Sequence, residues 1–121
     1  MQPKAVLALL ATAFGAIQGV QARGEFSRSC TNYYIENNNF LRATCKNASG
    51  GQVNSALNLN ACIGIASTSL VCRANGNYAA NGCRACLIRT GAYMLCGCPG
   101  GNKIADLDEC VANRNGLLAC A

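Results

Sequence analysis

Residues 107–120 read LDECVANRNGLLAC, and residues 59–72, 48 positions earlier, read LNACIGIASTSLVC. Each stretch holds two cysteines ten residues apart, and a leucine stands shortly before each cysteine. Each half of the chain also has two cysteines fifteen residues apart, repeated at an offset of 53: Cys30 and Cys45, and Cys83 and Cys98. The chain is therefore a tandem duplication whose second copy is five residues shorter, with repeats covering about 26–75 and 76–121.

The N-terminal residues 1–22 have the features of a secretory signal peptide. Lys4 supplies a positive charge, residues 5–17 form an almost unbroken apolar run, and small residues precede the expected cleavage point. The apolar run is shorter than the roughly 20 residues that a bilayer requires, so we expect no membrane insertion. We predict a secreted, extracellular protein with one compact domain over residues 23–121 and a net charge of about +4 once Lys4 is removed.

Ten cysteines in a secreted chain predict a disulfide framework. Because the chain has no histidine, we expect no metal site and no cofactor. Cysteines that face each other in a hairpin lie symmetrically about its turn, and the midpoints of five pairs fall on turn residues such as Asn115-Gly116. This symmetry predicts that every disulfide joins cysteines of the same half: Cys30–Cys45, Cys62–Cys72, Cys83–Cys98, Cys86–Cys96 and Cys110–Cys120.

Strand-forming segments lie between turns rich in glycine and asparagine. They are short, partly alternating stretches at residues 40–45, 57–60, 93–98 and 104–107. No long helical period follows residue 22. The sequence therefore predicts an all-β fold of two similar halves, each with a longer and a shorter hairpin. Disulfides, at roughly 2–4 kcal/mol each, compensate for a modest core.

Charge patterning excludes two classes of function. The basic residues are dispersed, without a run or an interleaved aromatic series, so we expect no nucleic-acid partner. A glycosidase needs two carboxylates that face each other across a bond. Asp106, Asp108 and Glu109 share one short segment, whereas Glu25 and Glu36 stand apart. We interpret the Asp106/Asp108 alternation as the solvent face of a strand and predict no catalytic residue and no enzymatic activity.

A set of motifs occurs in a fixed order over residues 26–120. They are Phe26-Ser27-x-x-Cys30, Leu41-x-Ala43-x-Cys45, Gly50-Gly51, Leu57-Asn58-Leu59-Asn60, Asn75-Gly76-Asn77-Tyr78, Leu107-Asp108 and Asn113-x-Asn115-Gly116-x-Leu118. With these motifs the chain resembles the cyanovirin-N homology domain, a sugar-binding lectin domain of cyanobacteria, filamentous fungi and some ferns. Its additional disulfides are similar to those of the fungal members.

The resemblance implies a pseudo-symmetric fold in which each half combines a three-stranded sheet with a hairpin. It also implies two carbohydrate sites at opposite ends, with mannose-rich oligosaccharides carrying α1-2-linked termini as typical ligands. Mannose-rich glycans or glycoproteins are therefore the expected partners. The protein is expected to be a monomer or a dimer swapped through the linker at about residues 75–82.

The first site implied by the resemblance combines the segment before Cys30, the segment after Cys45 and the turn of the last hairpin. It comprises Glu25, Arg28, Ser29, Lys46, Asn47, Ala48, Asn113, Arg114 and Asn115. Short amide and hydroxyl groups suit sugar hydroxyls. Asn113 and Asn115 also suit tight turns, and Lys46 and Arg114 also suit a plain charged surface, so both interpretations stay open.

The second implied site departs from the family pattern. Its remaining candidate residues are Ser67, Asn75, Asn77, Asn81, Gly82 and Asn102. The equivalent turn, at residues 64–68, lacks the expected asparagine, and the five-residue deletion shortens the loop after Cys98. We expect this site to be weak or altered.

Two functions are considered, depending on whether the first site binds sugar. The leading hypothesis is a secreted lectin. The alternative is a secreted, disulfide-rich structural or effector protein that has kept the scaffold and lost sugar binding. Asn47-Ala48-Ser49 is an N-glycosylation acceptor in the loop that should hold sugar, and a glycan at Asn47 would block the pocket.

Overall fold

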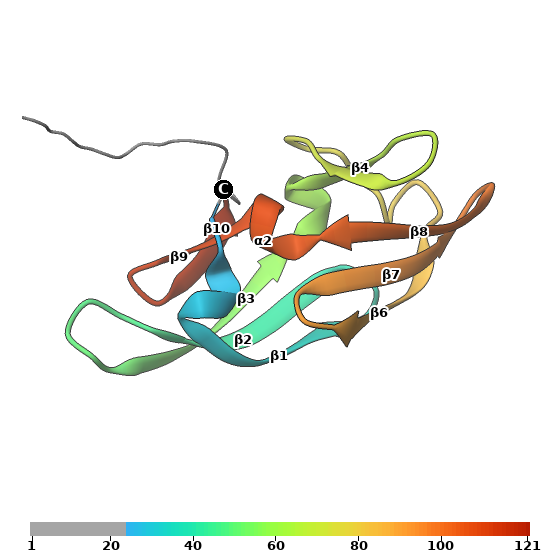
Figure 1. Cartoon of the computed structure of the whole chain (residues 1–121). Coiled ribbons are helices and arrows are strands. Elements are labelled where there is room, and N and C mark those ends of the chain that lie inside the picture. Colours follow the sequence, from blue (N-terminus) through green and yellow to red (C-terminus); the bar gives the residue numbers. More distant parts are fainter. Residues whose placement is uncertain (1–23) are drawn as a thin grey trace, which may run out of the picture.

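The computed structural model describes residues 24–121, so the predicted signal peptide at 1–22 lies outside the described residues. Two three-stranded antiparallel sheets and two hairpins make up most of the fold (Figure 1). The first sheet has the order β1 (Cys30–Glu36), β2 (Phe40–Lys46), β3 (Gln52–Asn58), and the second has the order β6 (Arg84–Thr90), β7 (Tyr93–Cys98), β8 (Gly101–Asp106). The hairpins are β4 (Ile63–Ile65) with β5 (Leu70–Cys72), and β9 (Val111–Arg114) with β10 (Leu117–Cys120). The predicted all-β architecture of two similar halves is confirmed.

Each sheet is covered by the hairpin of the other repeat. Strand β10 packs against β3, and β5 packs against β8. Figure 1 shows the β9–β10 hairpin beside β3 at one end and β4 above β8 at the other. The two repeats therefore share one continuous core, which includes Leu41, Leu59, Met94 and Leu107, all fully buried.

Three short helical segments connect the strands: η1 (Phe26–Arg28), η2 (Leu59–Ala61) and α2 (Leu107–Cys110). Two of them begin inside segments predicted as strands, because Asn58 and Asp106 cap them. The Asn58 side chain accepts from the Asn60 amide at 3.0 Å, and the Asp106 carboxylate accepts from the Asp108 amide at 3.1 Å. Strands β3 and β8 therefore end at the capping residue, and the interpretation of Asp106 and Asp108 as a strand's solvent face is wrong.

Asp108 instead ties the N-terminal turn to the second repeat. Its carboxylate accepts from the Ser27 amide at 3.0 Å and from the Ser27 hydroxyl at 2.5 Å. Tyr78 stands at the centre of the core with no exposed surface, and its hydroxyl donates to the Asn38 carbonyl at 2.5 Å. Burial raises the pKa of Tyr78 well above its usual range.

Three of the five predicted disulfides are confirmed: Cys30–Cys45, Cys83–Cys98 and Cys86–Cys96. A β-bulge at Ala85, whose φ is 54°, advances the register of β6 by one residue. This advance allows both pairs of the second sheet to face each other across β6 and β7. The first sheet has the same bulge at Asn32, with φ 55°, but holds Tyr33 and Ala43 where the second sheet holds Cys86 and Cys96.

The predicted pairs Cys62–Cys72 and Cys110–Cys120 are wrong. The structure joins Cys62 to Cys120 and Cys72 to Cys110. In the last hairpin Cys120 lies opposite Val111, and in the first Cys72 lies opposite Ile63. Neighbouring residues of a strand point to opposite faces, so a displacement of one residue turns each predicted partner away. Both disulfides therefore run between the two repeats.

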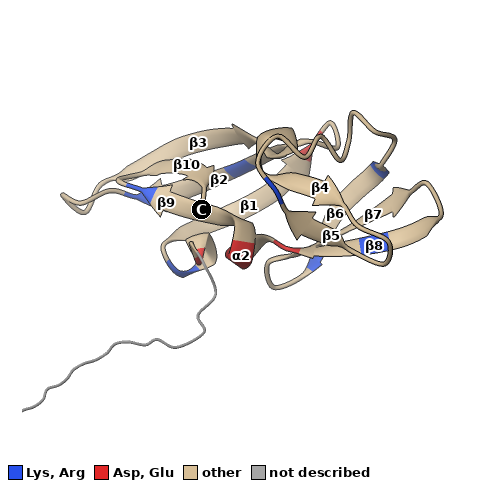
Figure 2. Ribbon diagram, turned by 90° about the horizontal axis from the view of Figure 1, so that it is seen from above, with Lys and Arg blue, Asp and Glu red and all other residues tan. Residues whose placement is uncertain are grey.

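Basic residues are spread over the ribbon and do not gather on one face (Figure 2). No helix within residues 24–121 is long and apolar enough to cross a bilayer.

Candidate functional site

The amide of Asn113 joins the three segments of the predicted first site. Its nitrogen donates to the Ser29 hydroxyl and to the Lys46 carbonyl, both at 2.9 Å, and its oxygen accepts from the Gly116 amide at 2.8 Å. Ser29 precedes β1, Lys46 ends β2, and Asn113 lies on β9. Because both amide hydrogens are used, Asn113 fixes the geometry of the site and has no donor left for a ligand.

Asn115 forms the hairpin turn and also contacts the loop after β2. It adopts a left-handed conformation with φ 55°, and Gly116 follows with φ 93°, as a two-residue hairpin turn requires. The side-chain amide oxygen of Asn115 accepts from the Ala48 backbone amide at 2.8 Å. Its amide nitrogen has no hydrogen bond to a residue in the described range and points to an exposed surface. The turn interpretation is confirmed, and the sugar contact stays a prediction.

The loop between β2 and β3 is closed by Asn47. The Asn47 oxygen accepts from the Gly51 amide at 2.8 Å and from the Ser49 hydroxyl at 3.0 Å. The tip of the β9–β10 hairpin packs closely against this loop. A methyl group at Gly116 would lie 2.8 Å from the Val53 side chain and 3.3 Å from Asn47 Cβ. The loop and hairpin are therefore held in one arrangement by packing as well as by hydrogen bonds.

Charged residues surround this arrangement. Glu25 is joined to the hairpin through a β-bridge with Ala112, and its carboxylate forms an ion pair with Arg28 at 3.0 Å. Arg114 donates to a carbonyl at the end of β10 at 3.3 Å, and Lys46 is exposed. All nine predicted residues thus lie in three adjoining segments. Three of the four charged ones are basic.

The structure does not assemble the predicted second site in the same way. Asn77 donates from its side chain to the Asn75 carbonyl at 3.0 Å, and the Asn81 amide donates to the Asn77 carbonyl at 2.9 Å. Within residues 24–121 no hydrogen bond joins these linker residues to Ser67, at the tip of the β4–β5 turn, or to Asn102, on the exposed face of β8.

The amide clamp of the first site has no counterpart here. Repeat symmetry puts Ile65 in the place of Asn113 and Gly82 in the place of Ser29. A methyl group at Gly82 would lie 3.0 Å from Pro99, so a side chain at this position would be crowded by the proline ring. The expectation that this site is weak or altered stays a prediction.

Sequence reasoning missed Lys103. Its side chain is 7% exposed, and its ammonium group donates to the Ser67 carbonyl at 2.7 Å, which holds the β4–β5 turn against β8. A signal existed in the alternation of β8. Lys103 and Ala105 are buried, whereas Asn102 and Ile104 are exposed.

The carboxylates serve structural contacts. Asp106 caps α2, Asp108 binds Ser27, and Glu36 accepts a short hydrogen bond from the Arg42 guanidinium. That hydrogen bond and the charge of Glu36 raise the pKa of Arg42. In the described part of the chain no cluster of three or more metal-binding side chains occurs.

Comparisons with known proteins concern the family and the fold. The family model described as CVNH domain matches residues 26–119. A variant of MoCVNH3, solved with (N-GlcNAc)4, has 18% identity and a TM-score of 0.73, over 84% of this chain and 100% of that chain. TbCVNH of T. borchii has 27% identity and a TM-score of 0.66, over 80% of this chain and 99% of that one. Microvirin, solved with mannobiose, has 21% identity and a TM-score of 0.58, over 81% and 99%. No curated protein matches the chain by sequence.

Proposed function

Because the chain belongs to the CVNH domain family, a family of lectins, we propose that it is a secreted, non-enzymatic lectin for mannose-rich oligosaccharides with α1-2-linked termini. The ligand would bind at the first site, formed by Ser29, the loop after β2 and the turn of the β9–β10 hairpin. Its partners would be glycans or glycoproteins that carry such chains. The mannobiose complex of microvirin supports the choice of ligand.

The clamp made by Asn113 is the observation that carries this proposal. Sugar hydroxyls exchange water hydrogen bonds for protein hydrogen bonds of similar worth, so affinity depends on donors and acceptors that are already in position. Asn113 spends its whole amide on holding Ser29 and Lys46 together. The amide nitrogen of Asn115 and the exposed Lys46 ammonium then remain as donors at the surface.

A single functional site follows from the asymmetry of the two ends. Ile65 and Gly82 stand where a second clamp would need polar side chains. One site of modest affinity gives no avidity by itself, because avidity requires two linked sites. We therefore expect weak, monovalent binding in the monomer.

Asn47 links this site to glycosylation. Its side chain closes the loop that packs against the hairpin, and residues 47–49 form an N-glycosylation acceptor. A glycan attached to the Asn47 amide nitrogen would replace a hydrogen there with a bulky chain at the entrance to the site. The glycosylated form should bind oligosaccharide more weakly than the unmodified form.

The test compares Asn115→Ala, Asn113→Ala and the unchanged protein by titration calorimetry with mannobiose and with a mannose-rich oligosaccharide. Loss of one sugar hydrogen bond in Asn115→Ala should weaken binding about threefold to tenfold. Loss of the clamp in Asn113→Ala should weaken binding further, because three segments lose their common anchor. Asn37→Gly, which removes an exposed asparagine from the turn between β1 and β2 and tolerates its φ of 54°, is the matched control and should leave the affinity unchanged.

The scaffold without sugar binding is the alternative, favoured by the missing clamp at the second end. Equal affinities in the three asparagine variants would exclude the first site. No binding to any α1-2 mannose terminus on a glycan array, by both the glycosylated and unglycosylated forms, would make the structural or effector protein the better account.

A further inference from the structure

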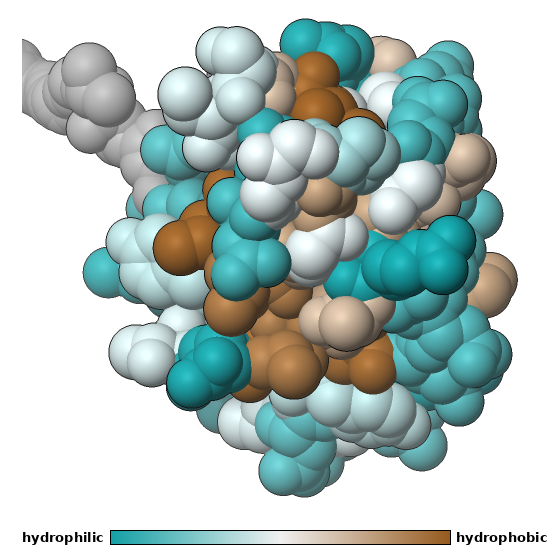
Figure 3. Space-filling view, turned by 90° about the vertical axis from the view of Figure 1, so that its right-hand side faces the viewer, coloured by the Kyte–Doolittle hydropathy of each residue, from teal (hydrophilic) through white to brown (hydrophobic). Residues whose placement is uncertain are grey.

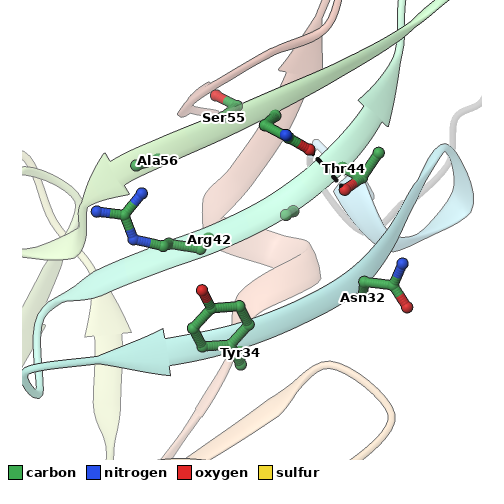
Figure 4. Close-up of a pocket in the computed structure, with 8 residues that line it drawn as sticks. Asn32, Tyr34, Arg42, Thr44, Ser55 and Ala56 are labelled. Atoms are coloured by element: carbon green, nitrogen blue, oxygen red, sulfur yellow. Dashed lines mark hydrogen bonds between the residues drawn. The ribbon is translucent and has the colours of Figure 1, made fainter.

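The outward face of the first sheet carries a depression of about 440 Å³. Alternation along the strands puts its polar side chains on the side of the sheet away from the core. The polar residues are Asn32, Tyr34, Arg42, Thr44 and Asn54, and the small residue Ala56 lies among them. Figure 4 shows Tyr34 and Asn32 on β1 beside Arg42 and Thr44 on β2.

This depression is separate from the first site. The β9–β10 hairpin packs against the opposite face of β3, where the Leu118 amide donates to the Ser55 hydroxyl at 2.9 Å. Asn54 and Ala56, the neighbours of Ser55, point the other way. A ligand in the depression would therefore lie on the far side of the sheet from the hairpin.

The side chains in the depression combine an aromatic surface with polar groups, and their one charge, on Arg42, is paired with Glu36. Tyr34 is 52% exposed, so its ring is open to a ligand. The Thr44 hydroxyl donates to the Asn54 oxygen at 2.9 Å, which orients the Asn54 amide and leaves its nitrogen free to donate. The Arg42 charge is balanced by Glu36, and its remaining guanidinium hydrogens are available as donors.

The second sheet provides an internal comparison, because the central row of the depression is apolar there, although Asn102 occupies the position of Asn54. In the first sheet Tyr34 faces Arg42, and Arg42 faces Ala56. The equivalent row of the second sheet is Leu87, Leu95 and Ile104. The fold therefore does not require polar residues at these positions.

Exposed hydrophobic residues mark the equivalent face of the second sheet. Leu87 and Ile104 are exposed there, as is Tyr93. Figure 3 looks at the end of the molecule where this sheet lies and shows hydrophobic residues gathered in one area among hydrophilic ones. Exposed tyrosines thus occur on both sheets, whereas, among the described residues, the hydrogen bond that orients the Asn54 amide and the arginine paired with Glu36 occur only on the first.

We propose that the outward face of β1–β3 is a second, independent carbohydrate-binding surface, which takes an uncharged oligosaccharide of equatorially substituted hexose rings. Such rings expose only C–H groups on their flat faces and can lie on the Tyr34 ring, while their rim of hydroxyls meets Asn32, Asn54 and Arg42. The absence of net charge disfavours anionic chains. An open depression of this volume suits several linked rings better than one terminal residue.

The β1-4-linked tetramer of N-acetylglucosamine is a suitable probe, and the oxidised protein is titrated with it while backbone amide NMR signals are followed. We expect shifts at the residues lining the depression and about tenfold weaker binding in Tyr34→Ala. Tyr93→Ala is the matched control, because Tyr93 is 50% exposed on the second sheet, and it should bind the tetramer as the unchanged protein does.

A first-site variant separates this surface from the proposed lectin site. Asn115→Ala should leave tetramer binding unchanged even where it weakens mannobiose binding. The proposal is overturned if the tetramer shifts no signal on β1–β3, if Tyr34→Ala binds it normally while retaining a folded amide spectrum, or if Asn115→Ala abolishes its binding. Failure of mannobiose to bind would instead count against the proposed function alone.

Discussion

Tyr78 makes the stability of this protein sensitive to alkaline pH. The phenol is fully buried and its pKa is raised in the folded state, whereas in the unfolded chain it ionises near pH 10. Above pH 10 the unfolded state therefore releases a proton that the folded state retains. Below pH 10 the ionisation of Tyr78 takes nothing from the free energy of unfolding. Above pH 10 this free energy falls by about 1.4 kcal/mol for each pH unit, until the pH reaches the folded-state pKa of Tyr78.

Tyr78→Phe removes this dependence and one hydrogen bond. At neutral pH the variant should be less stable by about 1 kcal/mol, because the bond to the Asn38 carbonyl is lost. With the slope above, the two stability curves should cross between about pH 10 and pH 11. All ten cysteines are paired, so no thiol is present to start disulfide exchange over this range.

Urea unfolding followed by circular dichroism at pH 8, 10 and 11 measures both curves. Tyr93→Phe serves as the control, because it removes a phenol that is 50% exposed and lies outside the core. Parallel curves for Tyr78→Phe and the unchanged protein up to pH 11 would refute the assignment of the alkaline loss to Tyr78.

Four further perturbations test the fold. Replacing the inter-repeat cysteines Cys62, Cys72, Cys110 and Cys120 by alanine opens loops of 58 and 38 residues and should cost about 7 kcal/mol or more of unfolding free energy. Removing Cys86–Cys96, with a loop of 10 residues, should cost about 2–3 kcal/mol, and equal denaturant midpoints for the two variants would contradict the pairing. Ala85→Gly should stabilise the protein by up to about 1 kcal/mol in a thermal melt, because glycine relieves a φ of 54°. Gly76→Ala should destabilise it by about 1–3 kcal/mol or more, since the added methyl would meet the Ile63 backbone at 2.4 Å, whereas the methyl of the control Gly97→Ala would have its nearest neighbours at 3.6 Å.

Much of the architecture was predictable because it depends on local chemistry and on the repeat. The Asn115-Gly116 turn, the cysteines fifteen residues apart and the strand segments all act within one hairpin. The pairing error also had a signal in the sequence. A two-residue turn places its centre between two residues, so directly opposed partners are an odd number apart, whereas Cys110 and Cys120 are ten apart. An even spacing is compatible with direct pairing only where the turn has an odd number of residues, as between Glu36 and Phe40, or where the register shifts, as between Ile88 and Thr90.

The sequence predicted which segments form the candidate site. It did not predict which side chains hold the site together and which remain free to bind a ligand. The family motifs predicted sugar contacts for both Asn113 and Asn115. In the structure, both amide hydrogens of Asn113 are donated to Ser29 and Lys46, whereas only the oxygen of the Asn115 amide is hydrogen-bonded. That difference depends on which side chains meet across 67 and 84 residues of chain, which no local pattern specifies. The polar face around Tyr34 was missed for the same reason, because its row exists only once the register of three strands is known.

The two disulfides between the repeats can form only after the second repeat has packed on a first repeat. While the cysteines are reduced, a second repeat can pack on the first repeat of its own chain or on that of a neighbour. Oxidation then converts whichever choice has been made into covalent structure, since Cys62–Cys120 and Cys72–Cys110 close within one chain in the monomer and would connect two chains in an exchanged dimer. Dilution would then not separate the chains of such a dimer, whereas in the monomer the same two disulfides hold the second repeat on its own first repeat.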